Sequence, residues 1–241
     1  MTNLTARDAA RKIDHTLLAP EATPAEIDAL CDEALRYGFG AVCVNPVHVR
    51  RVAARLDTAG AIPARRDSRT HIRSRPAIVS VAGFPLGANA PDTKATEARR
   101  AIDDGATEID MVVNLGALVG GDPATVRRDI EAVAHAVHGG APGLILKVIL
   151  ETGALTEEQV ILGCRCAAEG EADFVKTSTG FHPAGGATVE RVRLLKRYAS
   201  PLGVKASGGI RTASHMKAMI EAGASRIGTS SGVAIVRELE R

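Results

Sequence analysis

The chain is organised around one stretch, Asp173-Phe174-Val175-Lys176-Thr177-Ser178-Thr179-Gly180-Phe181. Phe174 and Val175 favour a β-strand, and Lys176 follows them inside a segment that we expect to be buried. Burial of an ammonium group is costly and lowers the pKa of a lysine, and a neutral amine can attack a carbonyl carbon. The stretch therefore predicts a Schiff-base lysine beside a small polar pocket. The alternative is a lysine at a strand end whose amine extends to solvent.

The scarcity of lysine in this chain favours the first interpretation. Seven of the 30 basic residues are Lys and the other 23 are Arg. Three of these lysines, Lys147, Lys176 and Lys205, nevertheless lie inside apolar, strand-like runs. Arginine keeps its proton in proteins whereas lysine can lose it, so lysine at these positions indicates that titration matters there.

The composition argues against nucleic-acid and membrane partners. The 241 residues carry a formal net charge of +2, and aromatic residues make up 2% with no Trp, so we expect neither a strongly basic surface nor a base-stacking platform. No apolar run approaches the roughly 20 residues that span a bilayer. Residues 1–12 lack the apolar core of a signal peptide, so we expect a cytoplasmic protein. Its cysteines are expected to be reduced and mostly buried: Cys31, Cys43, Cys164 and Cys166.

Strand-like and helix-like segments alternate along the whole chain. Apolar runs typical of strands occupy residues 13–18, 41–45, 77–81, 108–114, 144–150, 173–177, 203–206 and 226–229. Each is followed by a segment with helical periodicity or helix-capping residues. Eight such units of about 30 residues predict an α/β fold, a single (β/α)8 TIM barrel with a short N-terminal helix, as one domain over residues 1–241. A doubly wound open sheet is the alternative, but no GxGxxG motif follows the first strand.

One segment differs in composition from the rest. Residues 60–75 contain five arginines among Ser, Thr and Pro residues. This composition predicts a mobile surface loop between a helix and a strand, on the barrel face away from the chemistry. A nucleic-acid-binding arm is the alternative, and the absence of aromatic residues argues against it.

Polar residues on six of the predicted strands indicate one site. The chemistry of a βα barrel lies at the carboxyl ends of its strands. Neighbouring lysines lower one another's pKa, and carboxylates keep such a cluster near neutrality, so we expect a poised amine, a cationic neighbour and a carboxylate for proton transfer. The residues are Asp14, Cys43, Asp110, Lys147, Lys176 and Lys205. Cys43 either lines this pocket or fills the core, and both interpretations stay open.

Two glycine-rich loops predict a phosphate site. Ser207-Gly208-Gly209 follows the seventh predicted strand, and Gly228-Thr229-Ser230-Ser231-Gly232 follows the eighth and opens a short helix. Backbone N–H groups in such loops and at helix N-termini favour an anion, and barrels often bind phosphate at these two loops. Tight turns without a ligand are the alternative.

Other motifs predict no further chemistry. Gly228-x-Ser230-x-Gly232 has the form of a hydrolase nucleophile elbow, but that mechanism needs a downstream His and none follows His215. His135 and His138 share a helix face without an evident third ligand, so no metal site is expected.

Three motifs together resemble the deoxyribose-phosphate aldolases, which are class I (Schiff-base) aldolases. They are Lys176 in Phe-Val-Lys-Thr-Ser-Thr-Gly-Phe, Lys205 in Val-Lys-Ala-Ser-Gly-Gly-Ile-Arg, and Asp110 in Glu-Ile-Asp-Met-Val-Val-Asn. The likeness extends in order from Ile13 to Gly232, which is nearly the whole chain. Two features depart from it. The Arg-rich segment of residues 60–75 is longer than the family leads us to expect. Some members end in a Tyr that assists proton transfer, whereas this chain ends in Arg241, so we expect that contribution to be absent or supplied by water.

The resemblance implies a reaction and a set of residues for it. Lys176 would form the Schiff base, Asp110 and Lys205 would transfer protons, and a cationic Lys205 would hold Lys176 neutral, although the neutral member of this coupled pair stays open. Substrate contacts are expected from Asp14, Cys43, Lys147 and Thr179. Phosphate contacts are expected from Gly180, Gly208, Gly209, Ser230 and Ser231.

The implied reaction is the reversible cleavage of 2-deoxy-D-ribose 5-phosphate to D-glyceraldehyde 3-phosphate and acetaldehyde, in deoxyribonucleotide catabolism. The implied partners are a small phosphorylated sugar and an aldehyde, with no metal or organic cofactor, and the resemblance suggests a homodimer. The alternatives are a Schiff-base aldolase for a different phosphorylated sugar and a barrel that binds a phosphosugar without turnover.

Overall fold

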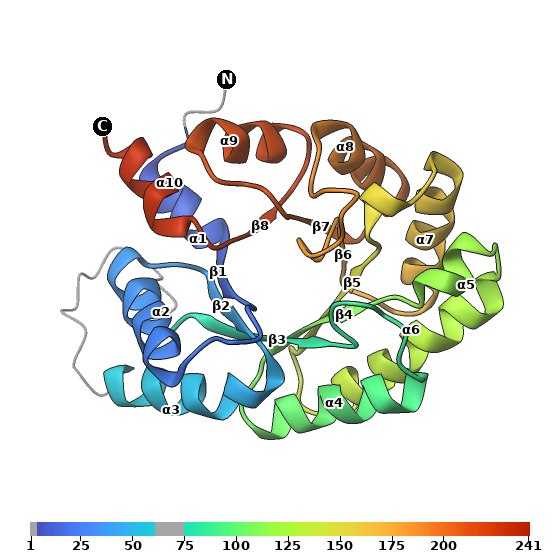
Figure 1. The fold of residues 1–241 in the computed structure, drawn as a ribbon, viewed down its shortest axis with the longest axis horizontal. Coiled ribbons are helices and arrows are strands. Elements are labelled where there is room, and N and C mark those ends of the chain that lie inside the picture. The colour runs from blue at the N-terminus through green and yellow to red at the C-terminus, as the bar shows by residue number, and fades with distance from the viewer. Residues whose placement is uncertain (1–3, 61–74) are drawn as a thin grey trace.

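A closed barrel of eight parallel strands lies at the centre of the computed structural model, which describes residues 4–60 and 75–241 (Figure 1). Each strand pairs with the next in the chain, and the last pairs with the first. The predicted TIM barrel is therefore confirmed. The strands are β1 (Ile13–Leu17), β2 (Ala41–Val44), β3 (Ala77–Ala82), β4 (Glu108–Val112), β5 (Ile145–Ile149), β6 (Phe174–Lys176), β7 (Gly203–Ser207) and β8 (Arg226–Thr229).

Helices surround the barrel, as Figure 1 shows. Two of them begin with capping boxes, at Thr23 with Glu26 and at Thr156 with Gln159. The α-helices are α1 (Ala6–Lys12), α2 (Pro24–Tyr37), α3 (Val49–Gly60), α4 (Pro91–Asp103), α5 (Leu115–Val119), α6 (Pro123–His138), α7 (Glu157–Glu169), α8 (Val189–Tyr198), α9 (Ala213–Glu221) and α10 (Gly232–Leu239), and the short 3-10 turns are η1 (Pro46–His48) and η2 (Thr152–Ala154). Among the described residues, none of these helices is both long and apolar enough to cross a membrane.

The region after β4 differs from the prediction. We expected a strand as far as Asn114, but the strand ends at Val112, and Asn114 caps the short helix α5 by accepting a hydrogen bond from the N–H of Ala117. The Asn114 N–H is itself bound by the carboxylate of Asp129 from α6. The contact with Asp129 of α6 therefore helps to set the end of β4. Local sequence propensity does not encode such a contact. The loop predicted for residues 60–75 lies outside the described residues except for its two ends.

Side-chain alternation along the strands creates two buried regions. Residues that point outward, such as Val42, Ile109 and Val175, pack with the helices in the main apolar core. The inward residues divide into an apolar half and a charged half. Strands β2 and β3 supply the apolar half, which contains Ala41, Cys43, Ala77, Val79 and Val81. The four cysteines are buried free thiols, as predicted.

Candidate active site

Seven charged side chains from six strands meet inside the barrel. Each lies at an inward position of its strand and is at most partly exposed. We call them the charged cluster: Asp14, Glu108, Asp110, Lys147, Lys176, Lys205 and Arg226.

Asp110 is the central acceptor of this cluster. Its Oδ1 accepts a hydrogen bond from Lys147 Nζ at 2.9 Å. Its Oδ2 accepts from Lys176 Nζ at 2.8 Å and from Lys205 Nζ at 2.6 Å. The two lysines that sequence reasoning placed together therefore share one carboxylate oxygen, and Lys176 and Lys205 are also neighbours in the register of β6 and β7.

Two members of the cluster were missed by sequence reasoning. Arg226 bridges two carboxylates, because its guanidinium donates to Asp14 and to Glu108. Glu108 also contacts Lys147 Nζ at 2.6 Å. The alternation of side chains along β4 could have identified Glu108. It lies two residues before the inward-pointing Asp110 on the same strand and must therefore point inward as well.

Charge balance within the cluster favours a neutral Lys176. If all seven groups were ionised, four positive charges would face three negative ones, whereas one neutral amine gives three of each. Burial lowers the pKa of Lys176, and the neighbouring Lys205 cation lowers it further against the pull of Asp110.

Three other members of the cluster, Lys205, Asp110 and Asp14, are held in their charged forms. Burial alone would lower the pKa of Lys205, but the carboxylates of Asp110 and Asp14 outweigh it and raise that pKa above its usual range. Burial likewise opposes ionisation of the aspartates, yet the lysines hold the pKa of Asp110 well below its usual value, and Lys205 with Arg226 lowers that of Asp14 to about 2. Lys176 is thus the amine whose surroundings favour loss of a proton.

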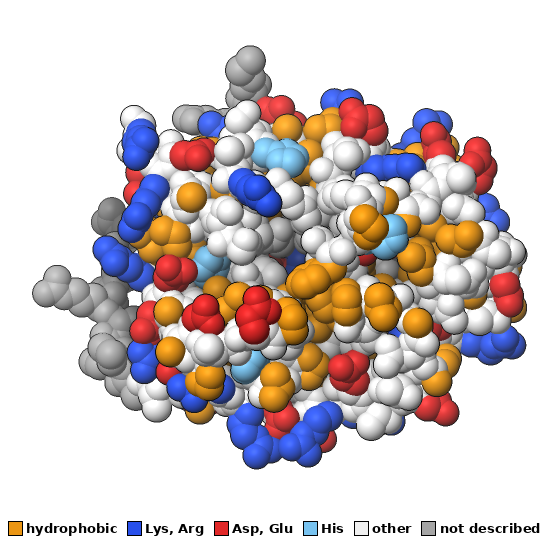
Figure 2. Space-filling view, viewed as in Figure 1, with side chains coloured by type: hydrophobic (Ala, Val, Ile, Leu, Met, Phe, Trp, Pro, Cys, Tyr) orange, Lys and Arg blue, Asp and Glu red, His pale blue; other side chains and the backbone are white. Residues whose placement is uncertain are grey.

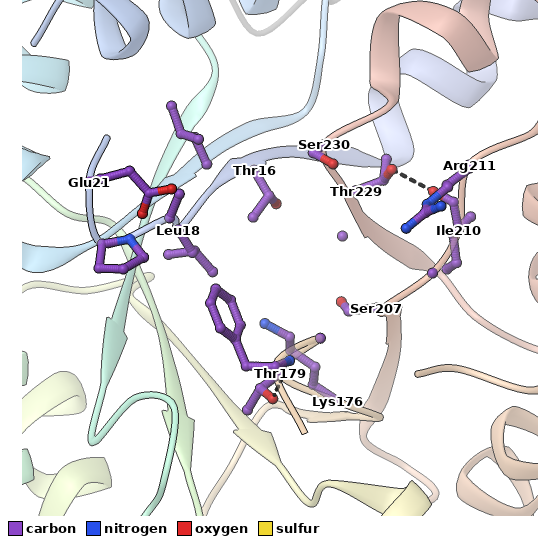
Figure 3. Close-up of a pocket in the computed structure, with 18 residues that line it drawn as sticks. Thr16, Leu18, Glu21, Lys176, Thr179, Ser207, Ile210, Arg211, Thr229 and Ser230 are labelled. Carbon is purple, nitrogen blue, oxygen red and sulfur yellow. Dashed lines mark hydrogen bonds between the residues drawn. The ribbon is translucent and has the colours of Figure 1, made fainter. Parts of the chain in front are cut away.

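A cavity of about 450 Å³ lies at the carboxyl ends of the strands, above the charged cluster (Figure 3). Of the seven cluster residues, all of them in the described part of the chain, Lys176 alone lines it. Figure 2 shows apolar side chains beside the hollow near the centre of this face, over the loop that follows β3, where Leu86 is exposed. The nucleophile candidate therefore lies in the wall of an open pocket.

The predicted phosphate loops surround the same cavity. Gly180, Gly208, Gly209 and Ser230 all line it. The three glycines have φ values of +86°, +91° and +77°, a region of backbone conformation that favours glycine. Ser231 does not line the cavity. It is the N-cap residue of α10, and its N–H donates a hydrogen bond to Thr229 Oγ1.

Two further residues near the loops were not singled out from the sequence. Arg211 lines the cavity beside Gly209 and brings a guanidinium to it (Figure 3). Glu151 is buried, and its carboxylate accepts hydrogen bonds from the N–H and the hydroxyl of Thr179, which lines the cavity. Glu151 adopts a φ of 59° two residues after the end of β5, and an acidic residue close to the end of a strand was the sequence feature that could have indicated it.

The remaining predicted residues lie away from the cavity wall. Asp14 and Lys147 are fully buried in the charged cluster beneath Lys176. Cys43 packs in the apolar half of the barrel interior, and burial raises the pKa of its thiol. Of the two interpretations of Cys43, this position favours a packing role.

Comparison with known proteins extends over nearly the whole chain. Residues 9–239 match the model of the DeoC/LacD family aldolases. The deoxyribose-phosphate aldolase of Thermococcus gammatolerans is 52% identical over 230 residues that cover 95% of both chains. Deoxyribose-phosphate aldolase 1 of Bacillus licheniformis is 50% identical over 231 residues, again 95% of both chains. Among solved structures, the tetrameric deoxyribose phosphate aldolase of Aeropyrum pernix superposes with a TM-score of 0.85 at 32% identity, covering 98% of this chain and 92% of that one.

Proposed function

The chain belongs to the DeoC/LacD aldolase family, and we propose that it cleaves 2-deoxy-D-ribose 5-phosphate reversibly through a Schiff base on Lys176. The products are D-glyceraldehyde 3-phosphate and acetaldehyde. The observation that carries the mechanism is the position of Lys176, whose amine lines the cavity while it contacts a carboxylate shared with a second, cationic lysine. Relatives named deoxyribose-phosphate aldolase, which are about half identical to this chain over nearly its full length, support this choice of substrate.

The first step is attack of the neutral Lys176 amine on C1 of the open-chain sugar. The carbinolamine must then lose its hydroxyl as water, which requires a proton at that oxygen. Asp110 accepts hydrogen bonds from both Lys176 and Lys205, so a proton can pass between the lysines and the substrate along this carboxylate or through a water beside it. The product of this step is a protonated imine.

The imine then serves as the electron sink for carbon–carbon cleavage. Loss of the C3 hydroxyl proton, which we attribute to water held by Asp110, lets the C2–C3 bonding electrons move toward the imine nitrogen. Glyceraldehyde 3-phosphate leaves, and the two-carbon enamine on Lys176 is protonated at C2. Hydrolysis of the resulting imine releases acetaldehyde and restores the amine. In the free enzyme Lys205 is cationic, which opposes protonation of Lys176.

The phosphate would lie against Gly180, Gly208, Gly209 and Ser230, with Ser231 at the adjacent helix N-terminus. Backbone N–H groups at glycine-rich turns suit an anion, and the Arg211 guanidinium adds a positive charge beside them. Thr179, held by Glu151, would contact the sugar from the β6 side. We propose that this activity serves deoxyribonucleotide catabolism in the cytoplasm.

Borohydride reduction in the presence of acetaldehyde, followed by peptide mass mapping, tests the proposal. We expect a two-carbon adduct on the peptide that contains Lys176. An adduct on the Lys205 peptide would exchange the roles of the two lysines. No adduct on a folded sample would favour a barrel that binds a phosphosugar without turnover.

Substrate identity needs a separate measurement. Release of acetaldehyde from 2-deoxyribose 5-phosphate, compared with cleavage of other phosphorylated sugars, distinguishes the proposed reaction from that of another Schiff-base aldolase. The homodimer stays a prediction, and the Aeropyrum pernix relative is a tetramer. Light scattering of the purified chain measures its assembly.

A further inference from the structure

A buried hydroxyl that the proposed mechanism does not use lies in the cavity wall. Ser207 is the last residue of β7, only 5% of its surface is exposed, and it lines the cavity with Lys176. Its Oγ has no hydrogen-bond partner among the described residues. Figure 3 shows this oxygen on the side of the cavity that faces Lys176. Because a buried polar atom without a partner is costly, the hydroxyl is a candidate ligand-binding group.

The backbone around Ser207 is held on both sides. Its N–H donates to Thr177 Oγ1 at 3.0 Å, and Thr177 Oγ1 in turn donates to the Ser207 carbonyl at 3.0 Å. The N–H of Ala187 also donates to that carbonyl, at 3.1 Å. The neighbouring strand has Gly228 in register with Ser207, and a Cβ there would collide with Ser207 Oγ. The backbone of Ser207 is therefore fixed in place, and its hydroxyl lies beside Gly228, which has no side chain to bind it.

The order of residues along β7 indicates which part of a substrate this hydroxyl would meet. Lys205 and Ser207 point to the same side of the strand, about 7 Å apart, with Ser207 nearer the mouth of the cavity. The next residues, Gly208 and Gly209, belong to the proposed phosphate site. Lys176, whose amine would hold C1 of the sugar, is in register with Lys205. Ser207 therefore lies between that amine and the loop that would hold the phosphate on C5.

We propose that Ser207 binds the C4 hydroxyl of the substrate and is a specificity-determining residue of this enzyme. This inference rests on the proposed function. The C4 hydroxyl neighbours the carbon that carries the phosphate and keeps its bonds throughout the reaction. A hydrogen bond to it therefore selects the substrate without taking part in proton transfer.

The chain offers a matched control in Ser178. This serine is also buried, and its Oγ also has no partner within the described ranges, but it does not line the cavity. Ser178→Ala and Ser207→Ala therefore remove the same atom from two similarly buried positions, of which only one borders the proposed substrate. Thermal unfolding of both variants shows whether either change alters the fold.

The test compares cleavage of 2-deoxyribose 5-phosphate with cleavage of its 4-deoxy analogue, with acetaldehyde release as the common readout. Each variant is compared with the parent chain on the same substrate, so differences in ring closure between the two sugars cancel. For Ser207→Ala we expect kcat/KM to fall about five- to tenfold on the first sugar, the effect of one hydrogen bond, and less than about twofold on the analogue. Ser178→Ala should change neither value.

Three results would overturn the inference: no loss with Ser207→Ala, an equal loss on both sugars, or an equal loss with Ser178→Ala. Borohydride trapping of acetaldehyde keeps these outcomes separate from failure of the proposed function, because acetaldehyde has no hydroxyl for Ser207 to bind. Suppose that the parent chain and Ser207→Ala both form the adduct on Lys176, but the substitution changes kcat/KM equally for the two sugars. The Schiff-base mechanism is then supported, and the proposed role of Ser207 is wrong. If the parent chain forms no adduct, the proposed function itself fails.

Discussion

Lys94, outside the barrel, and Lys176, inside it, are both buried, and each donates a hydrogen bond to an aspartate. Lys94 of α4 is fully buried and donates to Asp129 of α6 at 2.8 Å and to the carbonyl of Val112 at 2.9 Å. Lys176 donates to Asp110 at the same distance of 2.8 Å. Their immediate contacts are similar, but only Lys176 has the features of a nucleophile.

The difference lies in the number of cations that share the aspartate and in access to a cavity. Asp129 serves one lysine and also binds the Asn114 N–H, so it ties α4 and α6 to the end of β4. Asp110 serves three lysines, and one of them lines an open pocket. Burial lowers the pKa of both Lys94 and Lys176, but a neighbouring cation lowers that of Lys176 alone. A lowered pKa by itself therefore does not identify a catalytic lysine.

Replacing each lysine with an apolar residue is the strongest test of this contrast. Lys176→Leu should lower the rate of 2-deoxyribose 5-phosphate cleavage by at least about a thousandfold, because no other described residue of the cavity wall has an amine that can form the imine. The fold should survive, since the cluster then has three positive and three negative charges. Steady-state turnover and circular dichroism measure the two effects. Retention of even a few per cent of the parent activity would contradict the role of Lys176.

Lys94→Met should have the opposite profile. It leaves Asp129 buried without its cation, which should lower the free energy of unfolding by about 3–5 kcal/mol. Protein that remains folded should still be trapped on Lys176 by acetaldehyde and borohydride. Urea unfolding measures the first effect and mass mapping the second. A variant of normal stability without a trapped adduct would remove the distinction between the two sites.

Acid unfolding should depend on a carboxylate of the charged cluster. The pKa of Asp14 is lowered from 3.8 to about 2, so its contribution to stability is complete above its unfolded pKa and is lost as the pH falls toward 2. The shift corresponds to about 2 kcal/mol. Asp14→Asn should therefore flatten the fall in stability between pH 5 and pH 2, as measured by urea unfolding at each pH. An unchanged acid limb in a folded variant would show that Asp14 is not held in this way.

The smallest expected effect concerns the titration of Lys176. The Lys205 cation lowers the pKa of Lys176, so Lys205→Met should raise that pKa. The rate of borohydride trapping would then begin to rise at a higher pH than in the parent chain. Arg50→Met, at an exposed ion pair with Asp104, serves as a control and should leave the profile in place. A shift to lower pH with Lys205→Met would mean that Lys205 does not keep its neighbour neutral.

Local sequence patterns accounted for much of this molecule. Apolar runs and helix caps predicted eight strand–helix units, and the scarcity of lysine pointed to Lys147, Lys176 and Lys205, which all meet at Asp110. These inferences succeeded because strand alternation and helix capping depend on residues only a few positions apart. The helix α5 was missed because a contact with α6 determines where β4 ends.

Which inward side chains meet depends on the closed barrel and cannot be derived from local sequence patterns. Arg226 joins Asp14 and Glu108, which are separated from it by 212 and 118 positions in the chain, and this bridge exists only because the barrel closes. The same closure places Cys43 in the apolar half of the interior and Ser207 in the cavity wall. Alternation tells which face of a strand a residue occupies, but the stagger of eight strands sets its height and its neighbours. The sequence alone therefore determined the barrel and its candidate lysines, and closure of the barrel determined how their charges are balanced.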